Sequence, residues 1–396
     1  MMKSFRDELR CLLIGRGMPY EKIAFVVSLV ITVLFTVMMG MNYAKDTPIT
    51  VIDLDNSRYS RELVQKLDVS RFLKVQAVLN SPADPKVLMY RDKNYAVVYL
   101  PEGLEKKHYN RESCEVGVFY DNTSSASLSG VREALNEIVA DANNPSSGSR
   151  ESLQGGMLLV DRLLFNPHDS AANGEVVGFL TFFSSMFFAF AMLSLVPRLK
   201  MEGKYYLTLR KGMAFDLMQR AIPYCCLWLG ANFLGYVILR FWGDINFNGS
   251  IVLFFVVQAL FIWGLSLICI LFGWDCPHPG AAGSRMILFV PGGFIFGGYG
   301  VPLTLLPEWV RWFNQIFPLT WEFKFIRDVV FRGAGFMDCA VTIGQFLLYL
   351  SIVAVLFLWK FHKEQEKLTA REKDMTLVKE IRFSVCCREG TRLLEH

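Results

Sequence analysis

The chain has 396 residues, of which 53% are hydrophobic and 20% are charged. Its mean hydropathy of +0.31 is high for a globular protein in water, so the composition argues against a purely soluble protein. The formal net charge of +4 is small. The placement of the charges along the chain is therefore more informative than their sum.

Uncharged apolar segments divide the chain into regions. Residues 23–41 are long enough to cross a bilayer core of about 30 Å as a helix. Further apolar segments lie at 176–196, about 221–239, 251–273, about 286–301 and about 340–359. We therefore predict six transmembrane helices, the first at 23–41 and helices 2–6 within residues 176–360.

The fifth apolar segment is short and contains Pro291 and five glycines. Irregular backbone at membrane depth is tolerated only where protein buries it or where it lines a water-filled cavity. We therefore predict a broken transmembrane helix at this position. Gly293 and Gly297 have the GxxxG spacing that lets helices approach closely, and packing within the chain is the simpler explanation for them.

Basic residues in the short loops predict the orientation of the helices. Five Lys and Arg residues precede the first span, six lie in the 197–220 loop, and the segment after Lys360 is rich in both, whereas the loop after the third span has only Arg240. Because short basic loops remain in the cytoplasm, we expect both termini to be cytoplasmic and residues 42–175 to lie outside. We expect no cleaved signal peptide, and we interpret the last three residues of the 361–396 tail as a purification-tag remnant.

Residues 42–175 have the pattern of a water-soluble α/β domain. Segments rich in β-branched and aromatic residues predict four strands, at 49–55, 72–79, 95–101 and 114–120. Helical segments separate them, and Asn56 or Ser57 is suited to cap the first of these helices. The segment LLVDRLLFNP is expected to lead back to the membrane. The predicted fold is thus a mostly α-helical membrane protein with an extracytoplasmic α/β domain inserted between helices 1 and 2.

Three aspartates lie at predicted strand ends, where active sites often occur: Asp53, Asp55 and Asp121. Capping of helices and turns is the simpler explanation for them. The domain has no nucleophile motif, metal cluster or phosphate-binding loop, and the nine cysteines match neither a disulfide framework nor a zinc spacing. We predict no catalytic residue, no metal and no cofactor in this chain.

The segment 301–338 is rich in Trp, Phe and Pro and carries charges of both signs. It is too polar to span the membrane and too apolar for a free loop. We predict a re-entrant outer hairpin at 302–335, with aromatic rings at the level of the lipid headgroups. Membrane anchoring alone is the simpler explanation for these aromatic residues.

Five motifs within residues 1–360 resemble those of a known family, the permease subunits of type-2 ATP-binding-cassette (ABC) exporters with a large periplasmic domain, as found among multidrug-efflux permeases. The segment ITVIDLDNSRYSRELVQKL resembles the start of the family's outer domain, through Asp53, Asp55, Ser57, Ser60, Arg61 and Leu63. YAVVYLPEGLEKK resembles a strand and turn of that domain, and LLFNP resembles the Asn-Pro before the second span.

Two of the five motifs lie in the membrane half. The loop LKMEGKYYLTL…QRAIPY resembles the family's cytoplasmic loop, through Glu202, Gly203, Pro223 and Tyr224. The outer segment resembles a family pattern through Pro302, Pro307, Trp309, Pro318, Leu319, Thr320, Arg327 and Gly333. The chain departs from the family where a threonine of the loop is Lys204 and where a Thr-Pro pair is missing near Gly212, which leaves the details of the coupling surface open.

The resemblance implies a half-transporter, in which two six-span permeases, identical or paralogous, form a pathway above two separate ABC ATPase subunits. The chain lacks a Walker A motif, so ATP and Mg would be bound by the partner ATPase and this chain would not be an enzyme. Residues 1–22 would form an amphipathic helix on the cytoplasmic face of a bacterial inner membrane. The loop with Glu202, Gly203 and Lys204 would contact the ATPase, and the broken fifth span and the 302–335 hairpin would close the outer mouth.

The resemblance also implies that the outer domain receives cargo or binds a periplasmic adaptor of the membrane-fusion type. The cargo would be a hydrophobic or amphipathic drug, lipid or glycolipid, and nucleic acid is not an expected partner. One alternative is a membrane sensor or mechanotransmission protein with a periplasmic ligand-binding domain, although the tail after residue 360 is short for a cytoplasmic output domain. A membrane enzyme is a third class, disfavoured because no intramembrane acidic, His or Ser-Lys constellation is evident.

Overall fold

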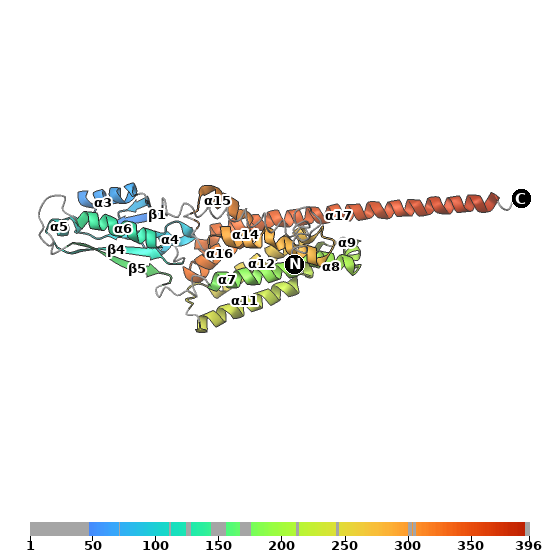
Figure 1. Cartoon of the computed structure of the whole chain (residues 1–396), viewed down its shortest axis with the longest axis horizontal. Helices are drawn as coiled ribbons and strands as arrows, with labels where there is room; N and C mark the ends of the chain where they lie inside the picture. Colours follow the sequence, from blue (N-terminus) through green and yellow to red (C-terminus); the bar gives the residue numbers. More distant parts are fainter. Residues whose placement is uncertain are drawn as a thin grey trace, which may run out of the picture.

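The computed structural model describes residues 47–70, 72–110, 112–123, 128–143, 156–166, 176–210, 214–242, 245–299, 303 and 306–392. The predicted amphipathic helix at 1–22 and the first predicted span at 23–41 lie outside these residues. An α/β domain forms one end of the molecule, a bundle of helices follows it, and the last helix, α17, projects from the far end of the bundle (Figure 1).

The α/β domain contains a five-stranded sheet in the order β2-β1-β3-β4-β5. Its strands are β1 (Thr47–Asp53), β2 (Leu73–Leu79), β3 (Ala96–Leu100), β4 (Cys114–Asp121) and β5 (Met157–Leu164). Neighbouring strands are parallel except β3 and β4, which are antiparallel. Because parallel strands need crossover connections, helices must cover at least one face of this sheet.

Strand β5 lies within the segment that was expected only to lead back to the membrane. It pairs in parallel with β4 along its whole length, from Met157 opposite Cys114 to Leu164 opposite Asp121. It is an edge strand, and Leu158 and Val160 remain exposed on one of its faces. Its sequence therefore lacks the strict apolar–polar alternation that identifies a half-buried strand.

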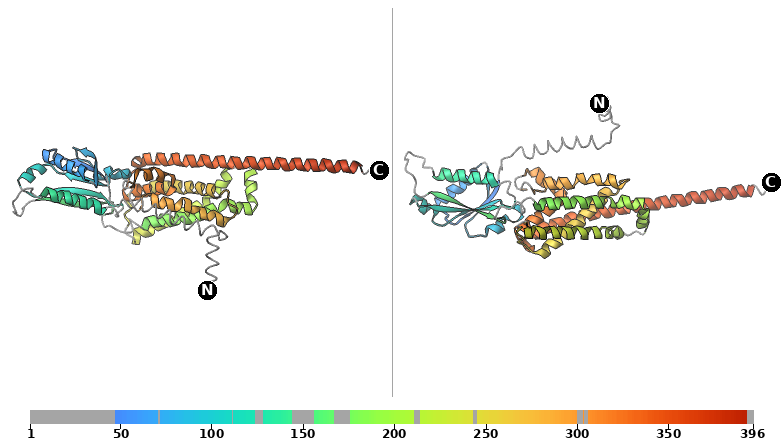
Figure 2. Two further views of the ribbon diagram at one scale, coloured as in Figure 1. Left: turned by 45° about the horizontal axis from the view of Figure 1, so that its top comes forward. Right: turned by 60° about the horizontal axis from the view of Figure 1, so that its bottom comes forward.

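One face of the sheet is covered by α3 (Arg58–Val69) and α6 (Leu128–Asn143), which lie along the same side (Figure 2). Leu63 of α3, Leu135 of α6 and Val51 of β1 belong to one buried apolar cluster there. Ser57 caps α3 in a reciprocal arrangement, in which the side chain of each of Ser57 and Ser60 accepts the other's backbone N–H at 3.0 Å.

The opposite face of the sheet contributes to a different core. Ile52 of β1 and Val97 of β3 pack with Met89 of the short helix α4 (Pro85–Met89), and all three are fully buried. These residues belong to the same apolar cluster as the helical region. The α/β domain is therefore packed directly onto the helices rather than joined to them only through linkers.

The helical region contains eleven described helices. They are α7 (Val177–Leu193), α8 (Leu195–Met201), α9 (Lys204–Arg210), α10 (Ala214–Gln219), α11 (Ile222–Trp242), α12 (Ile251–Gly273), α13 (Pro279–Gly283), α14 (Val290–Phe296), α15 (Glu308–Phe313), α16 (Pro318–Phe325) and α17 (Phe336–Arg392). Short 3-10 or π-helical turns connect several of them.

Among the described residues, four stretches are long and apolar enough to cross a membrane. They are Val177–Met201, Ala214–Phe241, Ile251–Gly273 and Phe336–Ala370. They correspond to the second, third, fourth and sixth predicted spans. The six-helix prediction is thus supported at four positions, and its first helix stays a prediction outside the described residues.

The fifth predicted span is not one continuous helix. A 3-10 helix (Ser284–Leu288) precedes α14, which has Pro291 in its first turn and ends before Gly297. A Cβ atom at Gly293 would lie 2.9 Å from the Cβ of Leu319 in α16, and one at Gly297 would collide with Phe323. The glycines therefore permit close packing of α14 on α16, whereas membrane crossing by this segment stays a prediction.

Helix α17 is 57 residues long, which corresponds to about 85 Å at 1.5 Å per residue. It begins at Phe336, before the predicted span at about 340–359, and continues through much of the predicted tail to Arg392. The start of the tail is therefore a continuation of the last membrane helix rather than a separate segment.

Candidate functional site

Five charged side chains meet between the α/β domain and the helical region, and we call them the junction cluster: Asp92, Asp121, Arg327, Asp328 and Arg332. The guanidinium of Arg332 lies 2.5 Å from Asp92, 2.5 Å from Asp121 and 2.6 Å from Asp328. That of Arg327 lies 2.9 Å from Asp92. Four of the side chains are at most 4% exposed, and Asp92 is 14% exposed.

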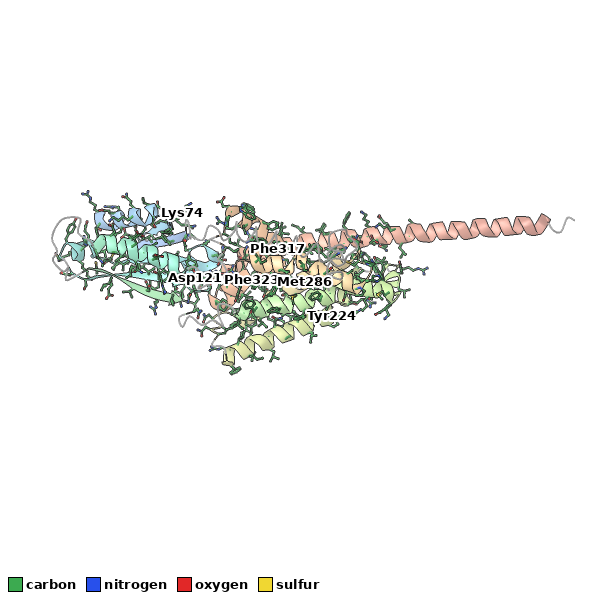
Figure 3. The ribbon with its side chains drawn as sticks, in the orientation of Figure 1. Lys74, Asp121, Tyr224, Met286, Phe317 and Phe323 are labelled. Atoms are coloured by element: carbon green, nitrogen blue, oxygen red, sulfur yellow. The ribbon has the colours of Figure 1, made fainter. Side chains whose placement is uncertain are left out.

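The two halves of the cluster come from different regions of the chain. Asp121 is the last residue of β4, at the junction with the helices (Figure 3), and its second carboxylate oxygen accepts the backbone N–H of Thr123 at 3.0 Å. Arg327 and Asp328 lie in a π-helical turn (Ile326–Phe331) that extends α16, and Arg332 follows it directly. Such turns occur frequently at functional sites.

A strained turn after α4 brings the α/β domain against the helices. Arg91 and Asp92 have φ angles of 62° and 54°, a left-handed conformation that costs energy for residues other than glycine and persists only where the surroundings impose it. The backbone N–H of Arg91 donates to Asp328 at 3.2 Å, and its side chain donates to the carbonyl of Asp338 in α17. The turn thus contacts both the π-helical turn and α17.

The charges in the cluster are unequal, because two arginines face three aspartates. Burial acts to raise the pKa of Asp92, but the charges and hydrogen bonds of Arg327 and Arg332 outweigh it and hold that pKa below its usual value. Burial raises the pKa of Asp328, and the charge of Asp92 adds to the shift against the opposing charge of Arg332. Asp328 is therefore the more easily protonated of these two carboxyl groups.

This arrangement is suited to holding the α/β domain in a fixed position relative to the helical region. Guanidinium–carboxylate pairs fix both distance and orientation, and a buried pair is strongly destabilised when one partner is removed. Among the described residues, no group of His, Cys, Asp and Glu has the arrangement of a metal site. The cluster therefore fixes the α/β domain against the segment after α16 through buried ion pairs.

A second polar contact lies within the helical region. Gln258 of α12 donates to one carboxylate oxygen of Glu322 in α16, and the two side chains are 4% and 1% exposed. Within the described part of the chain, the other oxygen of Glu322 has no hydrogen-bond partner. Because buried ionisable groups in membrane proteins usually mark functional sites, Glu322 is a second candidate residue.

The predicted coupling loop lies at the end of the helical region far from the sheet (Figure 1). Glu202 and Gly203 join α8 to α9, and the carboxylate of Glu202 pairs with Lys204 at 2.7 Å. Gly203 has a φ of 71°, which suits glycine at this turn. The hydrogen bond to Lys204 and its charge lower the pKa of Glu202. The loop is exposed and separate from the junction cluster.

The predicted outer-gate residues occupy different environments. Arg327 belongs to the junction cluster, and Pro318 is the first residue of the buried helix α16. Pro307 precedes α15, and Trp309 is 48% exposed on that helix. Pro302 lies outside the described residues. Of the four that the structure describes, only Arg327 belongs to the junction cluster.

Two aspartates of the predicted outer-domain motif form hydrogen bonds within the α/β domain. Asp53 accepts the hydroxyl of Ser60 at 2.7 Å and the backbone N–H of Asn56 at 2.9 Å. Asp55 accepts three backbone N–H groups at the start of α5 (Leu104–Tyr109). Arg61 is exposed on α3. Capping thus describes Asp53 and Asp55, whereas Asp121 has the different role described above.

Sequence reasoning missed most of the residues that make these contacts. Asp92, Asp328 and Arg332 belong to none of the motifs found in the sequence. The contact between Gln258 and Glu322 was also not predicted. The mixture of charges within the aromatic 301–338 segment was the available signal, since charged residues in so apolar a segment need partners. Their partners in the α/β domain are more than 200 positions away in the sequence.

The four candidate membrane helices and the α/β domain define a multi-pass membrane protein. Residues 23–200, a little under half of the chain, match the family model of ABC-2 family transporter proteins, and this match supports an ABC transporter permease. The family resemblance drawn from the motifs is confirmed to that extent. No curated protein matches the chain.

Proposed function

We propose that this permease subunit exports a hydrophobic or amphipathic substrate, driven by ATP and Mg bound in separate ABC ATPase subunits. The family match over residues 23–200 is the observation that carries the proposal. The separation of the α8–α9 loop and the α/β domain to opposite ends of the helices supports it (Figure 1), because an exporter needs its ATPase contact and its exit on different sides of the membrane.

In this proposal the α/β domain lies outside a bacterial inner membrane, and the loop at Glu202 meets the ATPase in the cytoplasm. A second permease subunit, identical or paralogous, completes the pathway. The exposed apolar side chains of α7, including Phe183 and Phe187, would face lipid or that subunit. The α/β domain receives cargo or binds a periplasmic adaptor of the membrane-fusion type.

The junction cluster would give the α/β domain its part in the transport cycle. It connects β4 and the turn after α4 to the segment that follows α16. A shift of α16 when the outer mouth opens would therefore be passed to the α/β domain, since these buried ion pairs resist separation.

The test is reconstitution of the permease with its ATPase in liposomes and measurement of ATP-dependent movement of a fluorescent amphiphile. We expect Glu202→Lys to reach normal membrane levels, because an exposed charge contributes little to folding, and to lose most transport. Glu137→Lys, the same charge change on exposed α6, is the matched control and should keep transport.

Two other results would change the assignment. Full transport by Glu202→Lys would remove the α8–α9 loop from the coupling mechanism. Ligand-stimulated ATP hydrolysis without movement of any amphiphile would support the membrane sensor or mechanotransmission protein instead.

A further inference from the structure

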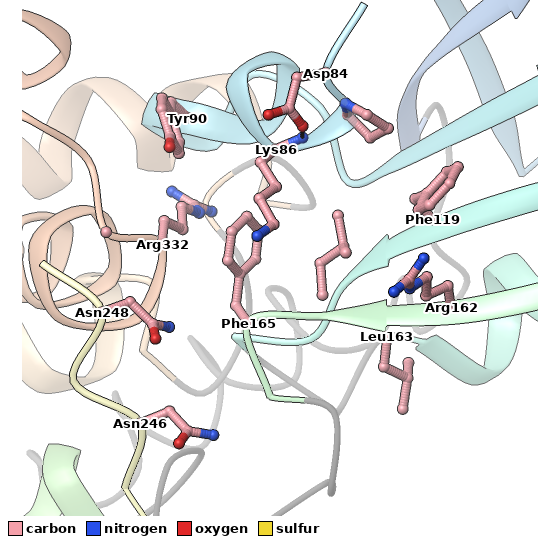
Figure 4. Close-up of a pocket in the computed structure, with 13 residues that line it drawn as sticks. Asp84, Lys86, Tyr90, Phe119, Arg162, Leu163, Phe165, Asn246, Asn248 and Arg332 are labelled. Atoms are coloured by element: carbon pink, nitrogen blue, oxygen red, sulfur yellow. Dashed lines mark hydrogen bonds between the residues drawn. The ribbon is translucent and has the colours of Figure 1, made fainter.

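An open cavity of about 790 Å³ lies beside the junction cluster (Figure 4). Its walls are the sheet face opposite α3 and α6, helix α4, and the chain segments around Asn248 and Gly333. The volume is in the range of small-molecule binding sites, roughly 300–1,000 Å³. Asn248 lies between the ends of α11 and α12, so the cavity is at the level where these candidate membrane helices end.

Two cationic side chains reach this cavity. Lys86 extends from α4, and Arg162 extends from β5 (Figure 4). Among the described residues, neither forms an ion pair. Asp84, the acidic residue in the wall, uses one oxygen to accept the backbone N–H of Lys86 at 2.9 Å. Arg332 is also in the wall, but it is already paired with three carboxylates.

Aromatic side chains adjoin these cations. Phe119 of β4 lies directly opposite Arg162 in the strand register, and both line the cavity. Phe165 follows β5 with a φ of 69°, which is rare for a bulky residue and clusters at ligand-binding positions. A turn in which the N–H of Asn166 donates to the carbonyl of Leu164 at 2.9 Å accompanies this conformation. The cavity thus combines unpaired positive charge with apolar surface.

We propose that this cavity binds an anionic amphiphile, with its phosphate held by Lys86 and Arg162 and its apolar chain packed against Phe119 and Phe165. A phosphate accepts charge-assisted hydrogen bonds from both cations, and the apolar chain gains from leaving water. Such a ligand has two sources, a phospholipid of the adjoining leaflet or a free amphiphile. Binding needs no ATP, so its failure and the failure of the proposed export are measured separately.

The test uses the full-length permease in phosphatidylcholine nanodiscs, titrated with dodecyl phosphate or inorganic phosphate in a calorimeter, with empty nanodiscs as the blank. We expect the double variant Lys86→Ala/Arg162→Ala to bind dodecyl phosphate at least about 10-fold more weakly, since it loses two charged contacts. Arg58→Ala/Lys74→Ala removes an equal charge from exposed positions outside the cavity and should bind as the wild type does.

A separate variant tests whether the apolar chain of the ligand packs against Phe119. Phe119→Ala should weaken the binding of dodecyl phosphate while the affinity for inorganic phosphate stays unchanged. The thermal midpoint of each variant is measured to check that it is folded. Native mass spectrometry identifies the source: retained phosphatidylglycerol that depends on Lys86 and Arg162 assigns a membrane lipid, whereas dodecyl phosphate binding without it assigns a free amphiphile.

Either source supports the site. Equal affinity of the wild type and the Lys86→Ala/Arg162→Ala variant for both dodecyl phosphate and phosphatidylglycerol would overturn the proposal. Binding of inorganic phosphate as tightly as dodecyl phosphate would also overturn it, because the apolar wall would then contribute nothing.

Discussion

Arg332 illustrates how single residues join the two parts of the molecule. Its guanidinium contacts carboxylates from the α/β domain, Asp92 and Asp121, and Asp328 from its own segment. Removing such a charge from water costs several kcal/mol, which the ion pairs offset only while they are complete. The residue therefore determines how the two parts are oriented more than it adds net stability.

Arg332→Met should destabilise the folded permease by about 3–5 kcal/mol, because it leaves buried carboxylates without their main partner. The measurement is the thermal midpoint of the detergent-purified protein, compared with the wild type. Arg311→Met is the control, since that arginine on α15 is exposed and 3.9 Å from an exposed glutamate, and it should change little. A wild-type midpoint for Arg332→Met would mean that these pairs do not hold the junction.

The lowered pKa of Asp92 predicts that the stability of the protein depends on pH. Its pKa in the folded protein lies below the ordinary value of 3.8, so its stabilising effect is complete above about pH 4 and is lost as the pH falls through the folded-state pKa. We expect Asp92→Asn to have a lower free energy of unfolding than the wild type at pH 7. This difference between the variant and the wild type should become smaller below about pH 4.

The comparison with a variant is needed because Asp328 acts in the opposite direction. Its pKa is raised, so its protonation on acidification favours the folded state. Asp84→Asn, at an exposed position, serves as the control with no comparable gap. A gap between Asp92→Asn and the wild type that stayed constant from pH 7 to pH 3 would contradict the assignment.

At the scale of elements, one polar contact joins α12 to α16. Gln258 donates to Glu322 where both are buried, and the second carboxylate oxygen has no partner within the described part of the chain. Burying an ionised carboxylate without a counter-ion is costly. The pair therefore limits how these helices can pack and makes α16 sensitive to the protonation of Glu322.

Gln258→Leu should destabilise the protein by about 1–3 kcal/mol, since Glu322 then loses its donor. Glu322→Gln keeps an acceptor for Gln258 and removes the charge, so its thermal midpoint should equal or exceed that of the wild type. In the double variant Gln258→Leu/Glu322→Leu, much of the loss should be recovered. Equal losses for Gln258→Leu and the double variant would show that the contact between the two side chains is not the cause.

At the scale of the whole molecule, the α/β domain and the α8–α9 loop lie at opposite ends of the helical region (Figures 1 and 2). The four candidate membrane helices lie between them. A membrane that contains these helices must therefore separate the two ends. Because the α8–α10 segment is rich in basic residues, we expect this end to be the cytoplasmic one.

Cysteine labelling tests that orientation. In a cysteine-free background, Lys74→Cys, at an exposed position on β2, should react with an impermeant maleimide added to spheroplasts. Lys204→Cys should react only after the membrane is opened. Both variants should react in opened membranes, which controls for accessibility, and labelling of Lys204→Cys in intact spheroplasts would reverse the orientation.

The sequence predicted those parts of the fold that depend on local pattern. Apolar runs located four stretches that the structure forms as long helices, and alternating strand and helix signals located β1 to β4. Strand β5 was missed because an edge strand with an exposed apolar face has no clear alternation. The family motif included Asp53 and Ser60 without pairing them, and the structure joins them by a hydrogen bond of 2.7 Å.

The amino-acid sequence by itself thus determined the membrane class, the α/β domain and the family resemblance, because hydropathy, periodicity and short motifs are local properties of the chain. Only the tertiary structure decided that Asp92 and Asp121 meet Arg332, 240 and 211 positions further along, and that Lys86 and Arg162 share one cavity. Contacts of this kind arise when the sheet packs on the helical region. Burial then selects which charges must be paired.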